Sequence, residues 1–298
     1  MQKYAFIFPG QGSQSMGMLS TFSDYPQVKN TFSQASEVLD YDLWDLIQNN
    51  PDDKLNETEF TQPAILTASI ALWRIWQDEM AEQPSLLAGH SLGEYSALVA
   101  AQSLDFQEAV LLVSKRGQFM QEAVPEGVGA MAAVLGLSDD EVKQICINAA
   151  QNEVVSAVNF NSPGQVVIAG HKAAVNRALE LIKQAGKRAI LLPVSVPSHC
   201  LLMKPAAEKL EHALKNITFK TPQIPVFNNI DVKCETDPDA IKSALIKQLY
   251  MPVRWVEIIE AMSATCEIFV ECGPGKVLTG LNKRINSELN TYSIMENK

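Results

Sequence analysis

Residues 85–101 read SLLAGHSLGEYSALVAA, and this stretch decides the fold class. The apolar run 85–89 predicts a short strand and the small-residue run 92–101 predicts a helix. Between them lies Gly-His-Ser-Leu-Gly, in which Ser91 is central. A Gly-x-Ser-x-Gly turn between a strand and a helix is typical of a nucleophile elbow, because the flanking glycines let the backbone fold back sharply. The stretch therefore predicts an α/β protein with Ser91 as a nucleophile.

The surrounding chain continues the α/β pattern. Residues 3–8 read as a buried strand that leads into a loop at 10–14, rich in backbone donors. Helical spacing of apolar residues follows over 26–48 and 62–80. A further helix is expected over 105–124, with Asp105 as its N-cap.

A second pattern begins near residue 129. A strand at 130–137, a helix at 138–150, two strands around 161–164, a helix at 172–185 and a strand at 188–194 give the order β-α-β-β-α-β. This is the order of a ferredoxin-like unit. The α/β alternation then resumes with helices near 205–216, 238–250 and 256–264 and strands near 225–228 and 267–271.

We therefore predict an α/β fold of two parts. An α/β-hydrolase-like large domain would comprise residues 1–127 and 196–298. A ferredoxin-like subdomain, residues 128–195, would be inserted into it.

Composition excludes several classes of function. The 298 residues carry a formal net charge of −10, which argues against a nucleic-acid partner, although a local basic patch could still bind an acidic protein. The apolar run before Pro9 is too short for a signal peptide or a membrane span. Five cysteines without CxxC spacing favour reduced thiols over a disulfide framework or a metal site. We expect a cytoplasmic monomer with no metal, no nucleotide cofactor and no membrane contact.

A serine nucleophile needs a base, and His199 is the best placed of the four histidines. It follows Pro197 and Ser198 where the chain returns to the large domain, so a site at the junction would receive it. A histidine held in a proline-fixed loop is the alternative interpretation. No acidic residue between 91 and 199 stands out as a triad member, which counts against an ordinary esterase.

Arg116 lies on the apolar stripe of the helix 105–124. A guanidinium in that position needs a partner, and its planar fork suits a carboxylate. The alternatives are an ion pair with an internal Asp or Glu, or extension of the side chain to solvent.

Several separated motifs together resemble the bacterial malonyl-CoA:acyl carrier protein transacylases of fatty-acid synthesis, over residues 6 to about 284. No motif position departs from the family pattern. The motifs, in chain order, are Phe8-Pro9-Gly10-Gln11-Gly12-Ser13-Gln14, Gly89-His90-Ser91-Leu92-Gly93-Glu94-Tyr95, Arg116-Gly117 with Met120-Gln121, Asn159-Phe160-Asn161-Ser162-Pro163-Gly164-Gln165, Pro197-Ser198-His199, Gln248-Leu249 and Gly273-Pro274-Gly275.

The resemblance implies a role for each matched residue. Ser91 would carry the acyl group and His199 would be its base and acid. The backbone carbonyl of Gln248 would orient the histidine, and the N–H groups of Gln11 and Leu92 would form the oxyanion hole. Arg116 would bind the free carboxylate of the substrate. Further substrate contacts are implied for Met120, Asn161, Gln165 and Ser198. Asn161 and Gln165 could equally be ordinary turn residues.

The implied reaction moves a malonyl group from malonyl-CoA to the pantetheine thiol of acyl carrier protein through a malonyl-serine intermediate, without a cofactor. The main alternative is a stand-alone acyltransferase of polyketide synthesis, which has the same chemistry and another carrier. A serine esterase or thioesterase, and a non-catalytic acyl-CoA-binding subunit, are the remaining alternatives.

Overall fold

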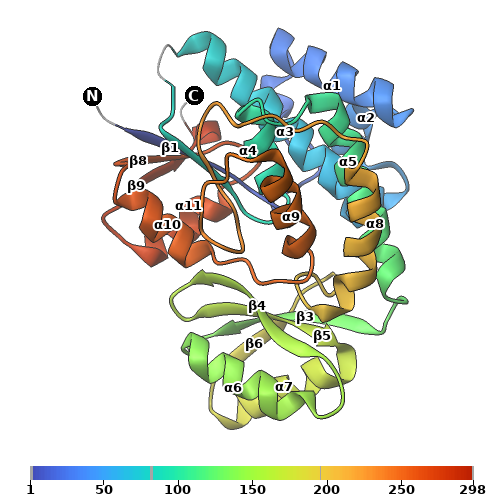
Figure 1. Ribbon diagram of the computed structural model, residues 1–298, viewed down its shortest axis with the longest axis vertical. Coiled ribbons are helices and arrows are strands. Elements are labelled where there is room, and N and C mark those ends of the chain that lie inside the picture. The colour runs from blue at the N-terminus through green and yellow to red at the C-terminus, as the bar shows by residue number, and fades with distance from the viewer. Residues whose placement is uncertain (1–2, 81–82, 195, 297–298) are drawn as a thin grey trace.

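The computed structural model describes residues 3–80, 83–194 and 196–296, and within them two sheets are formed (Figure 1). The larger sheet has the spatial order β7-β2-β1-β8-β9, and all its neighbouring strands are parallel. Its strands are β1 (Tyr4–Phe8), β2 (Leu86–Gly89), β7 (Val226–Phe227), β8 (Ile268–Glu271) and β9 (Asn290–Ser293). Because the strands are parallel, the loops that follow β1, β2, β7 and β8 leave from the same edge, where α/β proteins bind ligands.

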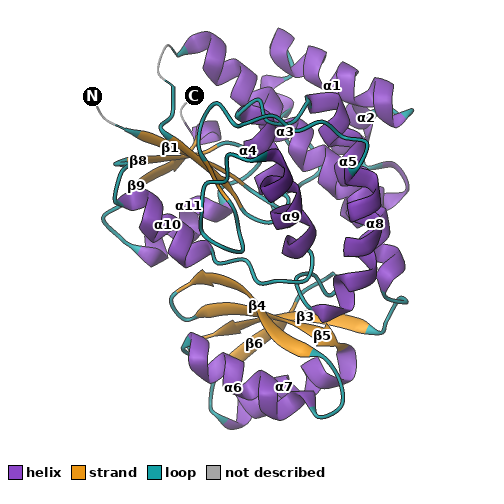
Figure 2. Ribbon diagram, viewed as in Figure 1, coloured by secondary structure: helices purple, strands orange, loops and turns teal. Residues whose placement is uncertain are grey.

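Both faces of the parallel sheet are covered, as Figure 2 shows. Alternation along β1 sends Phe6 and Phe8 into one core and Ala5 and Ile7 into the other. Helices that contribute to the first core are α1 (Pro26–Leu39), α2 (Leu43–Asn49), α3 (Thr58–Glu79), α4 (Gly93–Ala100), α5 (Phe106–Ala123), α8 (Lys204–Leu214) and α9 (Pro238–Gln248). The opposite face is covered by α10 (Trp255–Ser263) and α11 (Val277–Ile285).

The second sheet is antiparallel and has its own core. Its order is β4-β5-β3-β6, and α6 and α7 pack against it (Figure 1). The bounds are β3 (Gly129–Leu135), α6 (Asp139–Ala150), β4 (Val155–Ser162), β5 (Gln165–His171), α7 (Lys172–Gln184) and β6 (Arg188–Leu191). The succession of strands and helices is the one expected from the sequence. The expected boundary at residue 195 lies outside the described residues.

Two of the predicted helices show how capping sets their ends. The side chain of Asp105 accepts hydrogen bonds from Gln107 N and Glu108 N, so the predicted N-cap of α5 is confirmed. The expected helix over 26–48 is instead two helices. Asp40 has a left-handed backbone, φ 59°, and ends α1, after which Asp42 caps α2.

Short 3-10 helices fill several connections, at Ser20–Phe22, Pro51–Asn56, Leu201–Met203 and Ile294–Glu296. Neither the last of these nor α11 and β9 is foreseen in the sequence.

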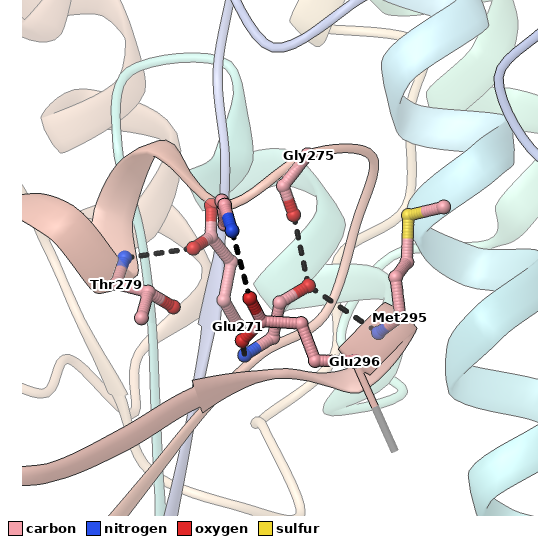
Figure 3. A network of polar contacts seen from close by, with 7 residues as sticks. Glu271, Gly275, Thr279, Met295 and Glu296 are labelled. Atoms are coloured by element: carbon pink, nitrogen blue, oxygen red, sulfur yellow. Dashed lines mark hydrogen bonds and ion pairs between the residues drawn. The ribbon is translucent and has the colours of Figure 1, made fainter. Parts of the chain in front are cut away.

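Figure 3 shows how the loop after β8 is held. Glu271 is fully buried, and its carboxylate accepts hydrogen bonds from Leu278 N at 3.0 Å and Thr279 N at 2.7 Å. Those N–H groups lie in the first turn of α11, which an acidic side chain stabilises. Ser293 Oγ of β9 donates to Gly275 O at 2.8 Å. The loop is thereby fixed beside the loop that follows β1, so closely that a Cβ on Gly273 would lie 2.4 Å from Pro9 Cγ.

Candidate active site

Ser91 lies at the carboxyl end of β2, in a turn that only glycine neighbours permit. Its own φ is +51°, an uncommon conformation for a residue with a side chain. A Cβ on Gly89 would lie 1.8 Å from the carbonyl carbon of Gly93, and one on Gly93 would lie 2.0 Å from Phe8 O. The two glycines thus allow β1, β2 and the start of α4 to touch backbone to backbone, and Ser91 protrudes at the tip.

His199 is hydrogen-bonded to Ser91. The distance from Ser91 Oγ to His199 Nε2 is 2.8 Å, and His199 Nδ1 lies 2.7 Å from Gln248 O. Since a carbonyl only accepts, Nδ1 carries the proton and Nε2 accepts from the serine hydroxyl. No carboxylate is needed to fix this tautomer, because a backbone carbonyl does so.

Burial sets the charge of His199. The side chain is buried, and burial lowers its pKa to about 3, with nearby Arg116 acting in the same direction. The ring is therefore neutral at physiological pH and able to accept a proton.

The guanidinium of Arg116 lies beside Ser91 and is 1% exposed. It donates from Nη1 to Gln62 Oε1 at 2.8 Å and from Nη2 to Gln248 Oε1 at 3.0 Å, and Nη2 is 3.4 Å from Ser91 Oγ. The ring of Tyr95 lies 5.4 Å from its central carbon. No Asp or Glu of the described residues forms an ion pair with it, and its Nε has no acceptor among them. The buried cation therefore forms no ion pair within the described chain and can form one with a ligand.

Two backbone donors lie near the serine. Gln11 follows β1 and Leu92 follows Ser91, and both line the cavity beside the serine. Neither N–H donates to an acceptor within the described residues. They are available to a ligand oxygen.

The cavity itself has a volume of about 170 Å³ and lies between the two sheets. The large part supplies Gln62 and Arg116, and the antiparallel sheet supplies Met131 and Val167. The cavity therefore lies where the two sheets meet, and His199 lines it, as the position of this residue in the sequence predicts.

The remaining predicted residues differ in how close they come to this cavity. Met120, Asn161 and Ser198 line it. Asn161 Oδ1 lies 2.8 Å from Nε2 of the half-buried His90, which also packs against Trp255. Gln165 does not line the cavity, because its Oε1 accepts from Arg284 Nη1 at 2.5 Å at the surface.

Sequence reasoning missed three polar residues that surround the site: Gln62, Glu94 and Asn229. Each is buried and hydrogen-bonded to a predicted site residue or its neighbour. The one available signal was a polar residue inside an apolar run. Gln62 precedes the run that forms the buried part of α3, and Glu94 stands among the small residues of α4.

Two kinds of feature are absent from the described residues. No group of three or more His, Cys, Asp or Glu side chains there could hold a metal ion. None of the helices described is both long and apolar enough to cross a membrane.

The fold and the site place the chain in the class of α/β proteins that present a serine–histidine pair at the carboxyl ends of parallel strands. A model of the acyl transferase domain matches residues 5–293. The malonyl CoA-acyl carrier protein transacylase of Escherichia coli strain K12 is 59% identical over 99% of this chain and 97% of its own length. That of Bacillus subtilis strain 168 is 46% identical over 99% and 94%. The chain belongs to the acyl transferase family, among the malonyl CoA-acyl carrier protein transacylases.

Solved structures agree with this assignment, and the resemblance stated from the motifs is confirmed. An acyl carrier protein S-malonyltransferase from Vibrio cholerae O1 biovar eltor has a TM-score of 0.95 at 60% identity, covering 98% of this chain and 96% of that one. A malonyl-transacylase in complex with a type II PKS acyl-carrier protein has a TM-score of 0.96 at 54% identity, covering 98% and 95%.

Proposed function

We propose that this protein transfers the malonyl group of malonyl-CoA to the pantetheine thiol of acyl carrier protein in fatty-acid synthesis, through a malonyl ester of Ser91. The observation that carries the proposal is a serine–histidine pair beside a buried arginine that has no carboxylate partner in the described chain. The transacylases to which the chain is similar act on the same two partners by name.

In the first half-reaction Ser91 Oγ attacks the thioester carbon and its proton passes to His199 Nε2. The new oxygen–carbon bond forms as the carbonyl oxygen becomes an oxyanion, which the N–H groups of Gln11 and Leu92 stabilise. Each such donor contributes about 3 kcal/mol to the transition state. The carbon–sulfur bond then breaks, and His199 gives its proton to the sulfur of CoA.

In the second half-reaction the carrier's thiol gives its proton to His199 and its sulfur attacks the ester carbon. The carbon–oxygen bond breaks, and the proton returns to Ser91 Oγ. Throughout, the Nδ1–H···O bond to the backbone carbonyl of Gln248 keeps the imidazole oriented toward Ser91 and stabilises its charged form.

Arg116 selects the acyl group. Its Nη atoms and unpartnered Nε face a small buried site, so a free carboxylate on the acyl chain would neutralise a desolvated cation. Burial lowers the pKa of Arg116, which reflects the cost of keeping that cation unpaired.

Met120, Asn161 and Ser198 are proposed as substrate contacts at the cavity wall. Gln165 is proposed to act farther out, toward the pantetheine arm, since it lies at the surface with Arg284.

The test is intact-mass measurement after mixing with malonyl-CoA. The wild type is expected to gain one malonyl group and Ser91→Ala none. A stable malonyl adduct on Ser91→Ala would contradict the nucleophile assignment. Release of CoA at the same rate with and without carrier protein would identify an esterase instead.

The polyketide alternative is not favoured, since the curated relatives carry the general transacylase name. A carrier of that class does bind the similar malonyl-transacylase described above. Comparing transfer rates to the two kinds of carrier separates the pathways.

We further propose the two-part division predicted from the sequence: a hydrolase-like domain of residues 1–127 and 196–298 and a ferredoxin-like subdomain of residues 128–195. The elbow supports the first name and the order β4-β5-β3-β6 with two helices supports the second. Five free cysteines support a reducing compartment, the cytoplasm, and we propose that the protein acts there as a monomer.

A further inference from the structure

A carboxylate lies beneath the elbow, outside the cavity. Glu94 is in the first turn of α4, three residues after Ser91, and is 3% exposed. Its Oε2 accepts hydrogen bonds from Asn229 N at 3.0 Å and from Gln248 Nε2 at 2.8 Å. One oxygen thus joins two segments that are far from α4 in the sequence.

The first of those segments holds the elbow. Asn229 follows β7, and its Oδ1 accepts from Ser91 N at 2.7 Å while its Nδ2 donates to Gly89 O at 2.7 Å. Both sides of the turn are therefore tied to one side chain. Such ties stabilise the uncommon backbone of Ser91, which is strained when unsupported.

The second segment, which contains Gln248, contacts the other two groups of the site, Arg116 and His199. Gln248 Nε2 also donates to Ser91 O at 3.0 Å. With its NH₂ group fixed on acceptors, Oε1 must face Arg116 Nη2, at 3.0 Å, and the backbone carbonyl of the same residue accepts from His199. A flipped amide would present donors to the guanidinium.

We propose that Glu94 is a positioning residue that sets Ser91, His199 and Arg116 in one arrangement through Asn229 and Gln248. A carboxylate suits this role because it only accepts, so it dictates which way the Gln248 amide points. The groups that face it are Arg116 and, with the opposite effect on its ionisation, Asp231. Burial raises the pKa of Glu94 to about 7, and protonation of Oε1 leaves Oε2 free to accept both hydrogen bonds.

The decisive variant is Glu94→Met, which keeps the volume and removes the acceptor. We expect the rate of Ser91 malonylation to fall about tenfold, and the ratio of malonyl-CoA to acetyl-CoA in kcat/KM to fall about tenfold, because Arg116 loses its fixed partner. Glu94→Gln retains one acceptor and should restore the ratio to within about threefold of the wild type. The ratio does not depend on the fraction of enzyme that is folded, so a merely destabilised protein would keep it.

Asn229→Ala tests the hydrogen bonds of the first segment, which hold the elbow, separately from those of Gln248, which hold His199 and Arg116. It should slow acylation by both substrates about equally, by about tenfold, and leave their ratio unchanged, since Asn229 reaches Arg116 only through a long hydrogen bond from Gln248 Nε2, at 3.4 Å, and that group keeps two closer acceptors among the described residues. Ser96→Ala is the matched control: Ser96 is buried in the same helix, its hydroxyl has no partner among the described residues, and both readouts should stay at wild-type values.

The malonyl readout rests on the proposed function, so labelling of Ser91 by a fluorophosphonate is measured as well. A wild type that reacts with the fluorophosphonate but not with malonyl-CoA would reject the proposed function alone. Slower labelling of Glu94→Met or Asn229→Ala supports the positioning role. Labelling of both variants at the wild-type rate overturns it, as does an unchanged substrate ratio in Glu94→Met. Should Glu94→Met fail to fold, the Asn229→Ala labelling rate decides.

Discussion

Arg116 is a cation held away from water, and its hydrogen-bond partners in the described chain are all neutral. Its Nη groups rest on two glutamine oxygens, which orient the fork without neutralising it. Such a cation raises the energy of the empty site, and a bound carboxylate removes that penalty. We propose that this unpaired charge selects substrates that carry a carboxylate.

Arg116→Ala is accordingly expected to lower the kcat/KM ratio of malonyl-CoA to acetyl-CoA by roughly 10- to 100-fold, the range for losing a hydrogen-bonded charge partner. Arg116→Lys should give an intermediate ratio, because it keeps the charge without the fork. Steady-state kinetics with both substrates measures this. Arg74→Ala, which removes a half-buried arginine from α3 outside the site, is the control. An unchanged ratio in Arg116→Ala would rule out the clamp.

The burial of His199 predicts how the stability of the folded protein depends on pH. In the folded protein His199 stays neutral down to about pH 3, whereas the unfolded chain takes up a proton below its ordinary pKa of 6.5. Its contribution to folding is therefore fully present above 6.5 and is lost as pH falls, by about 1.4 kcal/mol per pH unit.

Glutamine at this position does not titrate. Between about pH 7.5 and about pH 5, urea unfolding should show the wild type losing about 2 kcal/mol relative to His199→Gln. Glu94 is common to both proteins, so its titration cancels. Parallel loss of stability in the two proteins would show that His199 is not buried as described.

The three principal site residues were predictable because each breaks a local pattern. Ser91 stands between two glycines, His199 follows a proline loop and Arg116 interrupts an apolar stripe. Asn229 breaks no such pattern, and Gln62 gives only a weak signal at the edge of an apolar run. Their importance comes from hydrogen bonds to residues that are 138 and 54 positions away, which only the folded chain brings together.

At the scale of elements, the elbow depends on backbone contact between β1, β2 and α4. Because a Cβ on Gly93 would lie 2.0 Å from Phe8 O, Gly93→Ala must push the strand and helix apart. We expect a loss of about 3 kcal/mol or more in unfolding free energy and slower acylation of Ser91.

Gly280→Ala is the matched control for Gly93→Ala. Gly280 lies in α11 with no atom within 4 Å of the added Cβ, so alanine should stabilise by about 0.5–1 kcal/mol. Denaturant unfolding and single-turnover acylation of the two variants provide the comparison. A Gly93→Ala protein as stable as the wild type would mean that the elbow tolerates a wider spacing between β1 and α4.

Strong periodicity and clear caps made β1, β2 and α5 predictable. The break between α1 and α2 was missed because an aspartate in the left-handed region leaves the apolar spacing almost intact. The elements α11 and β9 were missed for another reason. Buried Glu271 and Ser293 hold them through contacts with the loop at 273–275, and that tertiary support leaves no local pattern.

At the scale of the whole molecule, this acidic chain still has basic side chains grouped on its surface, and such a group suits an acidic partner protein. Four exposed cations lie close to one end of the antiparallel sheet: Lys187 just before β6, Arg188 at its start, and Lys283 and Arg284 in α11. The contact of Arg284 with Gln165 brings α11 against the β4–β5 turn. We propose this group of four cations as the carrier's docking surface.

Lys187→Glu combined with Lys283→Glu should slow transfer to the carrier about tenfold at low salt and leave acylation by malonyl-CoA unchanged. Both lysines are chosen because Arg284 has a structural contact. Added salt should slow the wild type and shrink the difference. Lys29→Glu, on α1, is the control. Transfer that is insensitive to both salt and charge reversal would exclude this surface.

The hydrogen bonds of the site span long stretches of chain: Ser91 reaches His199 across 108 residues and Gln248 across 157. During synthesis the serine leaves the ribosome long before its base and the carbonyl that orients it. A chain ended before residue 199 has the nucleophile without its base, and one ended between residues 199 and 247 has the base without the carbonyl that orients it. The serine–histidine–carbonyl arrangement is therefore complete only after residue 248 has been added, and we expect chains that end before it to be acylated more slowly than the full chain.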